Sequence, residues 1–216
     1  MTWSLNEIEG LSRKAARGAG LSWGLAEEAG KATRWLCAAG LPGAEALAGL
    51  LRQNDGAEYD TICPLEDTGT WAAKSGALCP LISGAAICDH ASQIAEGRAL
   101  ELGQTSYPLL LLPYVAAAAQ SLETTIQIEW PGVSMSCGRD ARLIHSTPEA
   151  LASHSIPEIR ITRSRSNNGA RLDLRTRGDI TPEIAQVLTG FAHRTYAPDT
   201  AKSRLAGAGA GLSDND

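Results

Sequence analysis

One short stretch of the sequence combines cysteine with histidine, the residue types that serve as nucleophile and base or as metal ligands. Cys79 and Cys88 precede Asp89 and His90 there. A thiolate beside an imidazole can act as a nucleophile with its general base, which makes Cys88 and His90 candidate catalytic residues. The alternative is a buried cysteine beside a surface histidine, since cysteine is among the most buried residue types. No metal site is predicted, because zinc needs ligands that this stretch does not supply.

A glycine-rich loop at residues 18–24 precedes a predicted helix, and helix N-termini bind anions through their free backbone N–H groups. The candidate ligand-binding residues of this region are Lys14, Arg17, Gly18, Gly20 and Ser22. The spacing differs from a P-loop, and no strand precedes it as in a dinucleotide-binding loop. A turn between two helices, in which glycine permits close approach, explains the same residues.

Arginines alternate with leucines in a later stretch and predict a strand with one charged face. The alternating residues are Arg171, Leu172, Asp173, Leu174, Arg175 and Arg177. Arg175 and Arg177 are candidates for binding a small anionic ligand or an acidic partner. A solvated sheet face is the alternative. Nucleic acid is not a predicted ligand, because no aromatic residues interleave with the arginines to stack on bases.

The last ten residues, Gly207–Asp216, form a glycine-rich tail. Its candidate docking residues, onto the domain itself or onto a partner, are Gly209, Gly211, Ser213 and Asp214. The alternative is an unstructured terminus. The pentapeptide Gly-Ala-Gly-Leu-Ser occurs at both 18–22 and 209–213, and this repetition favours a tail that docks beside the first loop.

Hydrophobic periodicity predicts the elements that position these residues. Three helices are predicted at 5–17, 22–40 and 42–52, each closed by glycine or begun by a capping residue. Prolines and glycines interrupt residues 54–105, where we expect short helices and ordered loops that can wall a pocket.

The second half changes to the alternating pattern of strands. A hairpin is predicted from 126–130 and 133–137, with a third strand at 142–145 and a short helix after it. A second hairpin is predicted from 159–161 and 172–174, around the turn signal Asn167-Asn168-Gly169. Helices at 182–191 and 199–205 follow.

These patterns predict one α+β domain over residues 1–216. A helical unit at 1–53 packs on a mixed or antiparallel sheet of about four to six strands, and C-terminal helices complete the domain. No cofactor is indicated.

The composition of the chain limits which cellular compartment and which binding partners we expect for the protein. The net charge of −5 argues against a general nucleic-acid binder. Residues 139–216 carry 11 basic against 9 acidic side chains, so this part is the better host for an anion. Five cysteines without CxxC spacing predict a reducing compartment. No signal peptide or membrane span is predicted, which makes the cytoplasm the expected location.

Two segments resemble a known family. The run from Lys14 to Gly24 (KAARGAGLSWG) and the ending from Gly209 to Asp216 (GAGLSDND) are similar to a proteobacterial family of unknown function. The resemblance implies a bacterial protein, and it implies no reaction, ligand or catalytic residue.

Three functions remain open. The absence of a specific catalytic motif favours a soluble binding or accessory protein. An enzyme acting on a small anionic carboxylate or phosphate is the first alternative. A self-associating structural protein is the second, since alanine- and glycine-rich helices can pack across the interface of a homodimer.

Overall fold

A computed structural model describes residues 2–65 and 69–196. After the short strand β1 (Thr2–Ser4), three helices follow as predicted: α1 (Leu5–Gly18), α2 (Trp23–Ala38) and α3 (Gly43–Gln53). Ser4 caps α1 in a capping box, because its hydroxyl accepts the Glu7 N–H while the Glu7 carboxylate accepts the Ser4 N–H. The expected helical unit at the start of the chain is confirmed.

Short elements fill the interrupted stretch that follows, also as expected. The helices are α4 (Tyr59–Ile62), α5 (Pro80–Asp89), α6 (Ala91–Ala95) and a 3₁₀ turn, Pro108–Leu111, which leads into α7 (Leu112–Ser121). The later helices are α8 (Pro148–Leu151) and α9 (Pro182–His193). The helix predicted at 199–205 lies outside the described residues.

Six strands form one antiparallel sheet in the order β2-β8-β4-β5-β6-β9. Their bounds are β2 (Leu100–Leu102), β4 (Thr125–Trp130), β5 (Val133–Cys137), β6 (Ala141–Ser146), β8 (Ile159–Ser164) and β9 (Ala170–Arg171). Two antiparallel pairs stand outside it, β1 (Thr2–Ser4) with β10 (Arg177–Asp179), and β3 (Thr105–Ser106) with β7 (Ser155–Ile156). The predicted α+β class and the β4–β5 hairpin are confirmed.

The second predicted hairpin is wrong. Strand β8 is hydrogen-bonded to β2 on one side and to β4 on the other, so neither edge of β8 is free. Residues 170–171 therefore pair with the open edge of β6. Gly169 has a φ of +107° and runs against the backbone of Leu143, where a Cβ atom would collide. The glycine signal marks this close approach to β6 and does not mark a two-residue hairpin turn.

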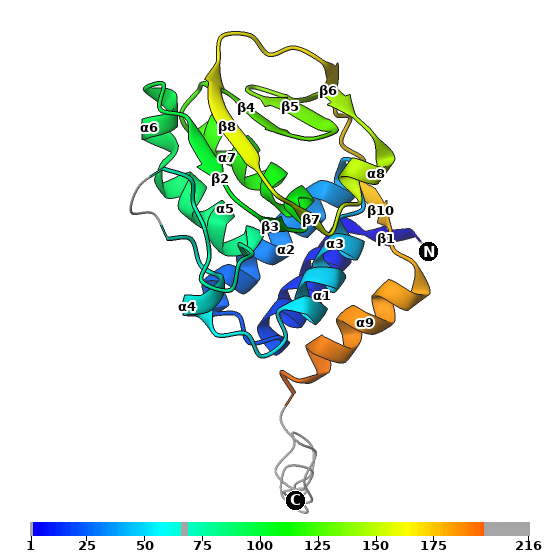
Figure 1. The fold of residues 1–216 in the computed structure, drawn as a ribbon. Helices are drawn as coiled ribbons and strands as arrows, with labels where there is room; N and C mark the ends of the chain where they lie inside the picture. Colours follow the sequence, from blue (N-terminus) through cyan, green and yellow to red (C-terminus); the bar gives the residue numbers. More distant parts are fainter. Residues whose placement is uncertain (1, 66–68, 197–216) are drawn as a thin grey trace, which may run out of the picture.

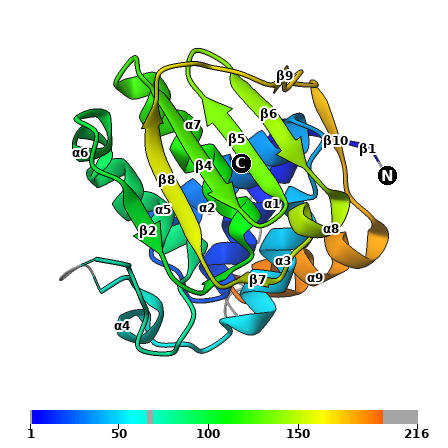
Figure 2. The ribbon, with the colours of Figure 1, turned by 45° about the horizontal axis from the view of Figure 1, so that its top comes forward.

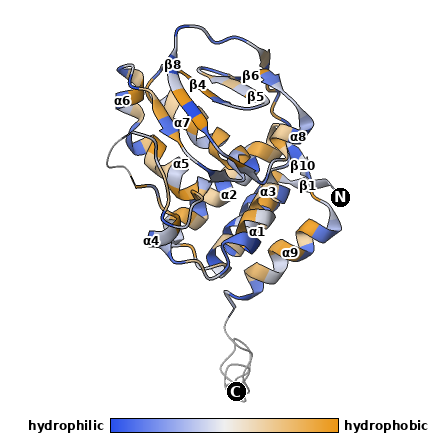
Figure 3. Ribbon diagram, in the orientation of Figure 1, coloured by the Kyte–Doolittle hydropathy of each residue, from blue (hydrophilic) through white to orange (hydrophobic). Residues whose placement is uncertain are grey.

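The elements form layers, with the sheet on one side, α5 and α7 beneath it, and α1–α3 with α9 on the far side (Figure 1). Seen from above the sheet, α7 and α2 lie behind the strands (Figure 2). Apolar residues are frequent along α7 (Figure 3). A helix that is apolar on nearly every side must be buried. Every residue from Leu112 to Ala119 except Ala117 is buried, and α7 is the central helix of this fold.

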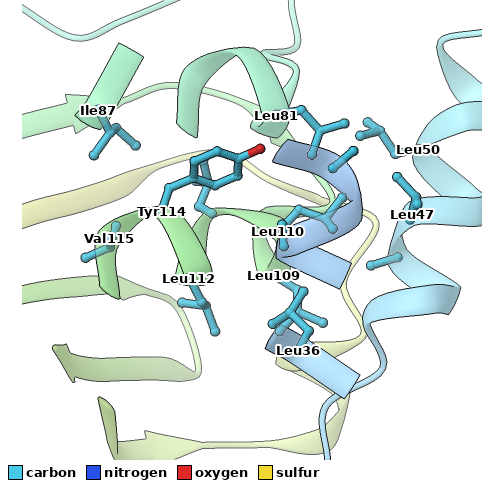
Figure 4. Close-up of a cluster of buried hydrophobic side chains, with 14 of the residues drawn as sticks. Leu36, Leu47, Leu50, Leu81, Ile87, Leu109, Leu110, Leu112, Tyr114 and Val115 are labelled. Atoms are coloured by element: carbon cyan, nitrogen blue, oxygen red, sulfur yellow. The ribbon is translucent and has the colours of Figure 1, made fainter. Parts of the chain in front are cut away.

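The core beside α7 is close-packed. The Tyr114 ring lies among Leu81, Leu110 and Val115 (Figure 4), and it lies against Gly84 of α5, where a Cβ atom would collide with the ring. Among the described residues, no helix combines the length and the apolar character that a membrane span requires.

Glycine substitutions in α1 test how closely α1 and α9 pack. A Cβ atom at Gly18 would collide with the Phe191 carbonyl of α9, whereas one at Gly10 would meet no atom within 4 Å. We expect Gly18→Ala to lower the free energy of unfolding by about 1–3 kcal/mol through overpacking. We expect Gly10→Ala to raise it by about 0.5–1 kcal/mol, because alanine favours a helix. Urea unfolding measures both, and equal effects would contradict the close helix contact.

Candidate functional site

The predicted glycine loop is the turn between α1 and α2. Gly20 has a φ of +100° and follows the last turn of α1. The Leu21 N–H donates to the Ala16 carbonyl at 3.2 Å and the Gly20 N–H donates to the Arg17 carbonyl at 3.0 Å. This is the glycine-terminated helix end of a Schellman motif, which requires a left-handed residue at the position of Gly20.

Two of the other predicted residues hold this turn together. The Ser22 hydroxyl accepts the Leu25 N–H at 3.4 Å and caps α2. Arg17 Nη1 donates to the Leu21 carbonyl at 2.8 Å, and its guanidinium lies 5.1 Å from the Trp23 ring centre. Lys14 is exposed on α1. Among the described residues, Arg17 thus stabilises the α1–α2 turn through its hydrogen bond to Leu21 and its contact with Trp23.

The turn forms one wall of a pocket between the ends of four helices. We call this the helical pocket. Its volume is about 500 Å³. The lining comes from the α1–α2 turn, the end of α3, α4 and the start of α5: Ala19, Gly20, Leu21, Ser22, Leu25, Leu50, Leu51, Asn54, Gly56, Ala57, Tyr59, Ile62, Cys79, Leu81 and Ile82. No charged side chain belongs to the lining that the described residues form.

Cys79 supplies the buried polar group of the helical pocket. It is the residue before Pro80, which begins α5, and only 3% of it is exposed. Burial raises the pKa of the Cys79 thiol. A smaller opposing effect comes from hydrogen bonds that the thiol makes with the Ile82 and Leu81 N–H groups and with the Asn54 side chain. The thiol is therefore neutral at neutral pH, and Asn54 links it to the end of α3.

The predicted catalytic residues lie at the far end of α5, with Cys88 in its last turn and His90 directly after the helix. The Cys88 thiol donates to the Tyr114 carbonyl at 3.6 Å, and burial, with smaller contributions from Asp89 and Glu28, raises its pKa to about 11. The His90 ring packs edge-on against Trp71 with 5.4 Å between ring centres. Among the described residues, no group of three His, Cys, Asp or Glu side chains is arranged to hold a metal ion.

The predicted arginines lie at the opposite end of α2 from the glycine loop. The Arg175 N–H donates to the Ala38 carbonyl at 2.8 Å, and its guanidinium lies beside Gly40. Arg177 Nη2 donates to the Thr2 carbonyl at 3.0 Å, in the β1–β10 pair. A helix of this length spans roughly 24 Å, so the structure does not bring Arg175 and Ser22 together.

The tail residues Gly209, Gly211, Ser213 and Asp214 lie outside the described residues, and their docking stays a prediction. Sequence reasoning missed the other walls of the helical pocket, above all Leu50, Leu51 and Asn54. The signal for Cys79 was present, since Pro80 suits the first position of a helix and marks Cys79 as the residue that precedes it.

Comparison with known proteins gives a family match for the first third of the chain. Residues 3–79 match the model of a family described as a protein of unknown function, DUF3726. The predicted resemblance to an uncharacterised family is thus confirmed. The matched region contains every lining residue of the helical pocket except Leu81 and Ile82. No curated protein matches the chain.

One solved structure with some likeness is the malate dehydrogenase from Entamoeba histolytica, at 12% identity and a TM-score of 0.46. The match covers 73% of this chain and 47% of that one, so the chain spans about half the length of that structure. A likeness this weak assigns neither a fold nor an activity.

The pKa of Cys88 gives a test of the predicted nucleophile. Because the thiolate is the reactive form, a pKa of about 11 predicts that alkylation of Cys88 by iodoacetamide speeds up about tenfold per pH unit between pH 8 and 10. Peptide mass spectrometry after timed quenching measures the rate at this one cysteine. A rate that levels off below about pH 9 would contradict the raised pKa of Cys88 and would indicate an ordinary or activated thiol. The predicted Cys88–His90 pair requires an activated one.

Proposed function

We propose that the protein binds a small, predominantly apolar and uncharged molecule in the helical pocket. The observation that carries the proposal is the lining, in which described backbone, aliphatic, hydroxyl, amide and thiol groups surround about 500 Å³ without a charged side chain among them. Small-molecule sites have volumes of about 300–1,000 Å³ and are mostly apolar with a few fixed polar groups.

The lining of the helical pocket favours a neutral ligand over a small anionic metabolite, the ligand class that the sequence suggested. Burying apolar surface contributes about 25 cal/mol per Å², and the half-buried Leu21, Leu25 and Ile62 offer such surface. A carboxylate placed among them would lose its hydration without gaining a cationic partner, which is costly. Arg17 does not line the pocket, and it already donates to the Leu21 carbonyl.

The polar groups of the pocket orient the ligand. Cys79 and Asn54 lie side by side and hydrogen-bond to each other, while Ser22 and Tyr59 belong to the more exposed part of the lining. A ligand with a single carbonyl, hydroxyl or ether group can bond to this pair while its apolar part lies against the leucines.

Binding without catalysis is the role that the thiol supports. A nucleophilic cysteine needs a lowered pKa, and burial instead raises the pKa of Cys79. A neutral thiol in a mostly apolar wall is suited to contact a ligand and not to attack it. This supports a binding or accessory role ahead of an enzymatic one.

A bulky side chain at the pocket tests the proposal. Ala57 is exposed and lines the pocket, so Ala57→Trp places an indole in the space for the ligand without disturbing the core. We expect it to weaken binding of the neutral apolar fluorophore N-phenyl-1-naphthylamine at least about tenfold, since ligand and indole compete for one volume. Fluorescence titration gives the dissociation constant.

The matched control is Ala152→Trp, which adds the same side chain at an exposed alanine outside the pocket. It should leave the affinity unchanged. Native mass spectrometry with a library of neutral apolar fragments then identifies the ligand class, with Ala57→Trp as the blocked reference. Equal affinity for the wild type and Ala57→Trp, with both folded by circular dichroism, would refute the proposal.

A further inference from the structure

A second pocket lies at the end of the sheet, where α7 leads into β4 and the β5–β6 turn approaches it. We call it the sheet-end pocket, and its volume is about 600 Å³. Its lining is polar, unlike that of the helical pocket: Ala119, Gln120, Glu123, Thr124, Thr125, Gly138, Arg139 and Asn167. Two hydroxyls, two amides, one carboxylate and one guanidinium of the described residues thus surround one space.

Glu123 holds a backbone conformation that glutamate rarely adopts. Its φ is +49°, in the left-handed region. It follows the end of α7, where the Thr124 N–H donates to the Ala119 carbonyl at 3.0 Å and the Glu123 N–H donates to the Gln120 carbonyl at 3.2 Å. Glycine is the usual residue at this position of a helix end. A charged residue stands in the pocket wall where the backbone alone favours glycine.

Asn167 brings an unsatisfied acceptor to the same wall. Its Nδ2 donates to the Asp140 carbonyl at 3.0 Å, and this bond fixes which way the amide is turned. Its Oδ1 is then the free end, and that atom is buried without a hydrogen-bond partner among the described residues. Buried acceptors normally have a donor, so this atom is an unsatisfied acceptor beneath the pocket wall.

The two charged side chains of the pocket do not neutralise each other. Glu123 and Arg139 are both exposed and come from different turns. Among the described residues, neither takes part in an ion pair or a side-chain hydrogen bond. Two opposite charges that line one pocket without contacting each other are complementary to a molecule that carries both charges.

We propose that the sheet-end pocket binds a small zwitterion with one ammonium and one carboxylate group, the chemistry of a free α-amino acid. Arg139 binds the carboxylate, and Glu123 binds the ammonium group. Thr124, Thr125 and Gln120 contact the remaining polar atoms. This site is separate from the helical pocket and shares no described residue with it.

The experiment compares three forms of each ligand on the full chain. A thermal-shift screen of the free L-amino acids selects the best binder, and isothermal titration gives its affinity. The carboxamide of that amino acid retains only the ammonium charge, and the N-acetyl form retains only the carboxylate. We expect each singly charged form to bind at least about tenfold more weakly, because each lacks one charge-assisted contact.

Variants then assign the charges. Glu123→Gln and Arg139→Gln should each weaken binding of the free amino acid at least about tenfold. Glu96→Gln and Arg13→Gln remove the same charges at exposed positions outside the pocket and should leave binding unchanged. Glu123→Gly suits the left-handed backbone, so it should fold at least as stably as the wild type and still lose affinity.

Three results would overturn the proposal. The first is that no free amino acid binds at millimolar concentration. The second is that the carboxamide or the N-acetyl form binds as tightly as the zwitterion. The third is that both charge variants retain full affinity. The helical pocket serves as an internal reference, because Ala57→Trp should not change amino-acid binding.

Discussion

The fold depends on the burial of α7. From Leu112 to Ala119 the side chains of this helix are apolar apart from the Tyr114 hydroxyl, and all of them except Ala117 lie away from solvent. Fully burying one leucine or valine contributes about 1.5–3 kcal/mol. Because the sheet covers α7 on one side and α2 and α5 cover it on others, the two halves of the chain share a single core.

The geometry of the helical pocket depends on that core. Helix α5 lies so close to α7 that Gly84 leaves no space for a Cβ atom beside Tyr114. This contact fixes the start of α5, and with it Cys79, against the end of α3. The sheet-end pocket lies at the other end of the same framework, since Gln120 and Glu123 follow from the last turn of α7.

Sequence patterns predicted the elements that local signals define. The Ser4 and Ser22 caps, the glycines after α1 and α2, and the alternation in β4 and β5 depend on neighbours in the chain, and all of them correspond to elements of the structure. The pairing of residues 170–171 was mispredicted, because it depends on which strand edges are already occupied. The helical pocket could be predicted only in part. Gly20 and Ser22 were candidates, but Leu50 and Cys79 join them only through tertiary packing.

The contact between α1 and α9 links the two ends of the described chain. Gly18 meets Phe191 across this contact, and β1 pairs with β10 beside it. Contacts between residues so distant in sequence are slow to form. On the ribosome, α2 can cover one side of α1 soon after both helices emerge, but the side of α1 that contacts α9 stays uncovered until α9 has been synthesised. The early chain exposes a surface of the kind that chaperones protect.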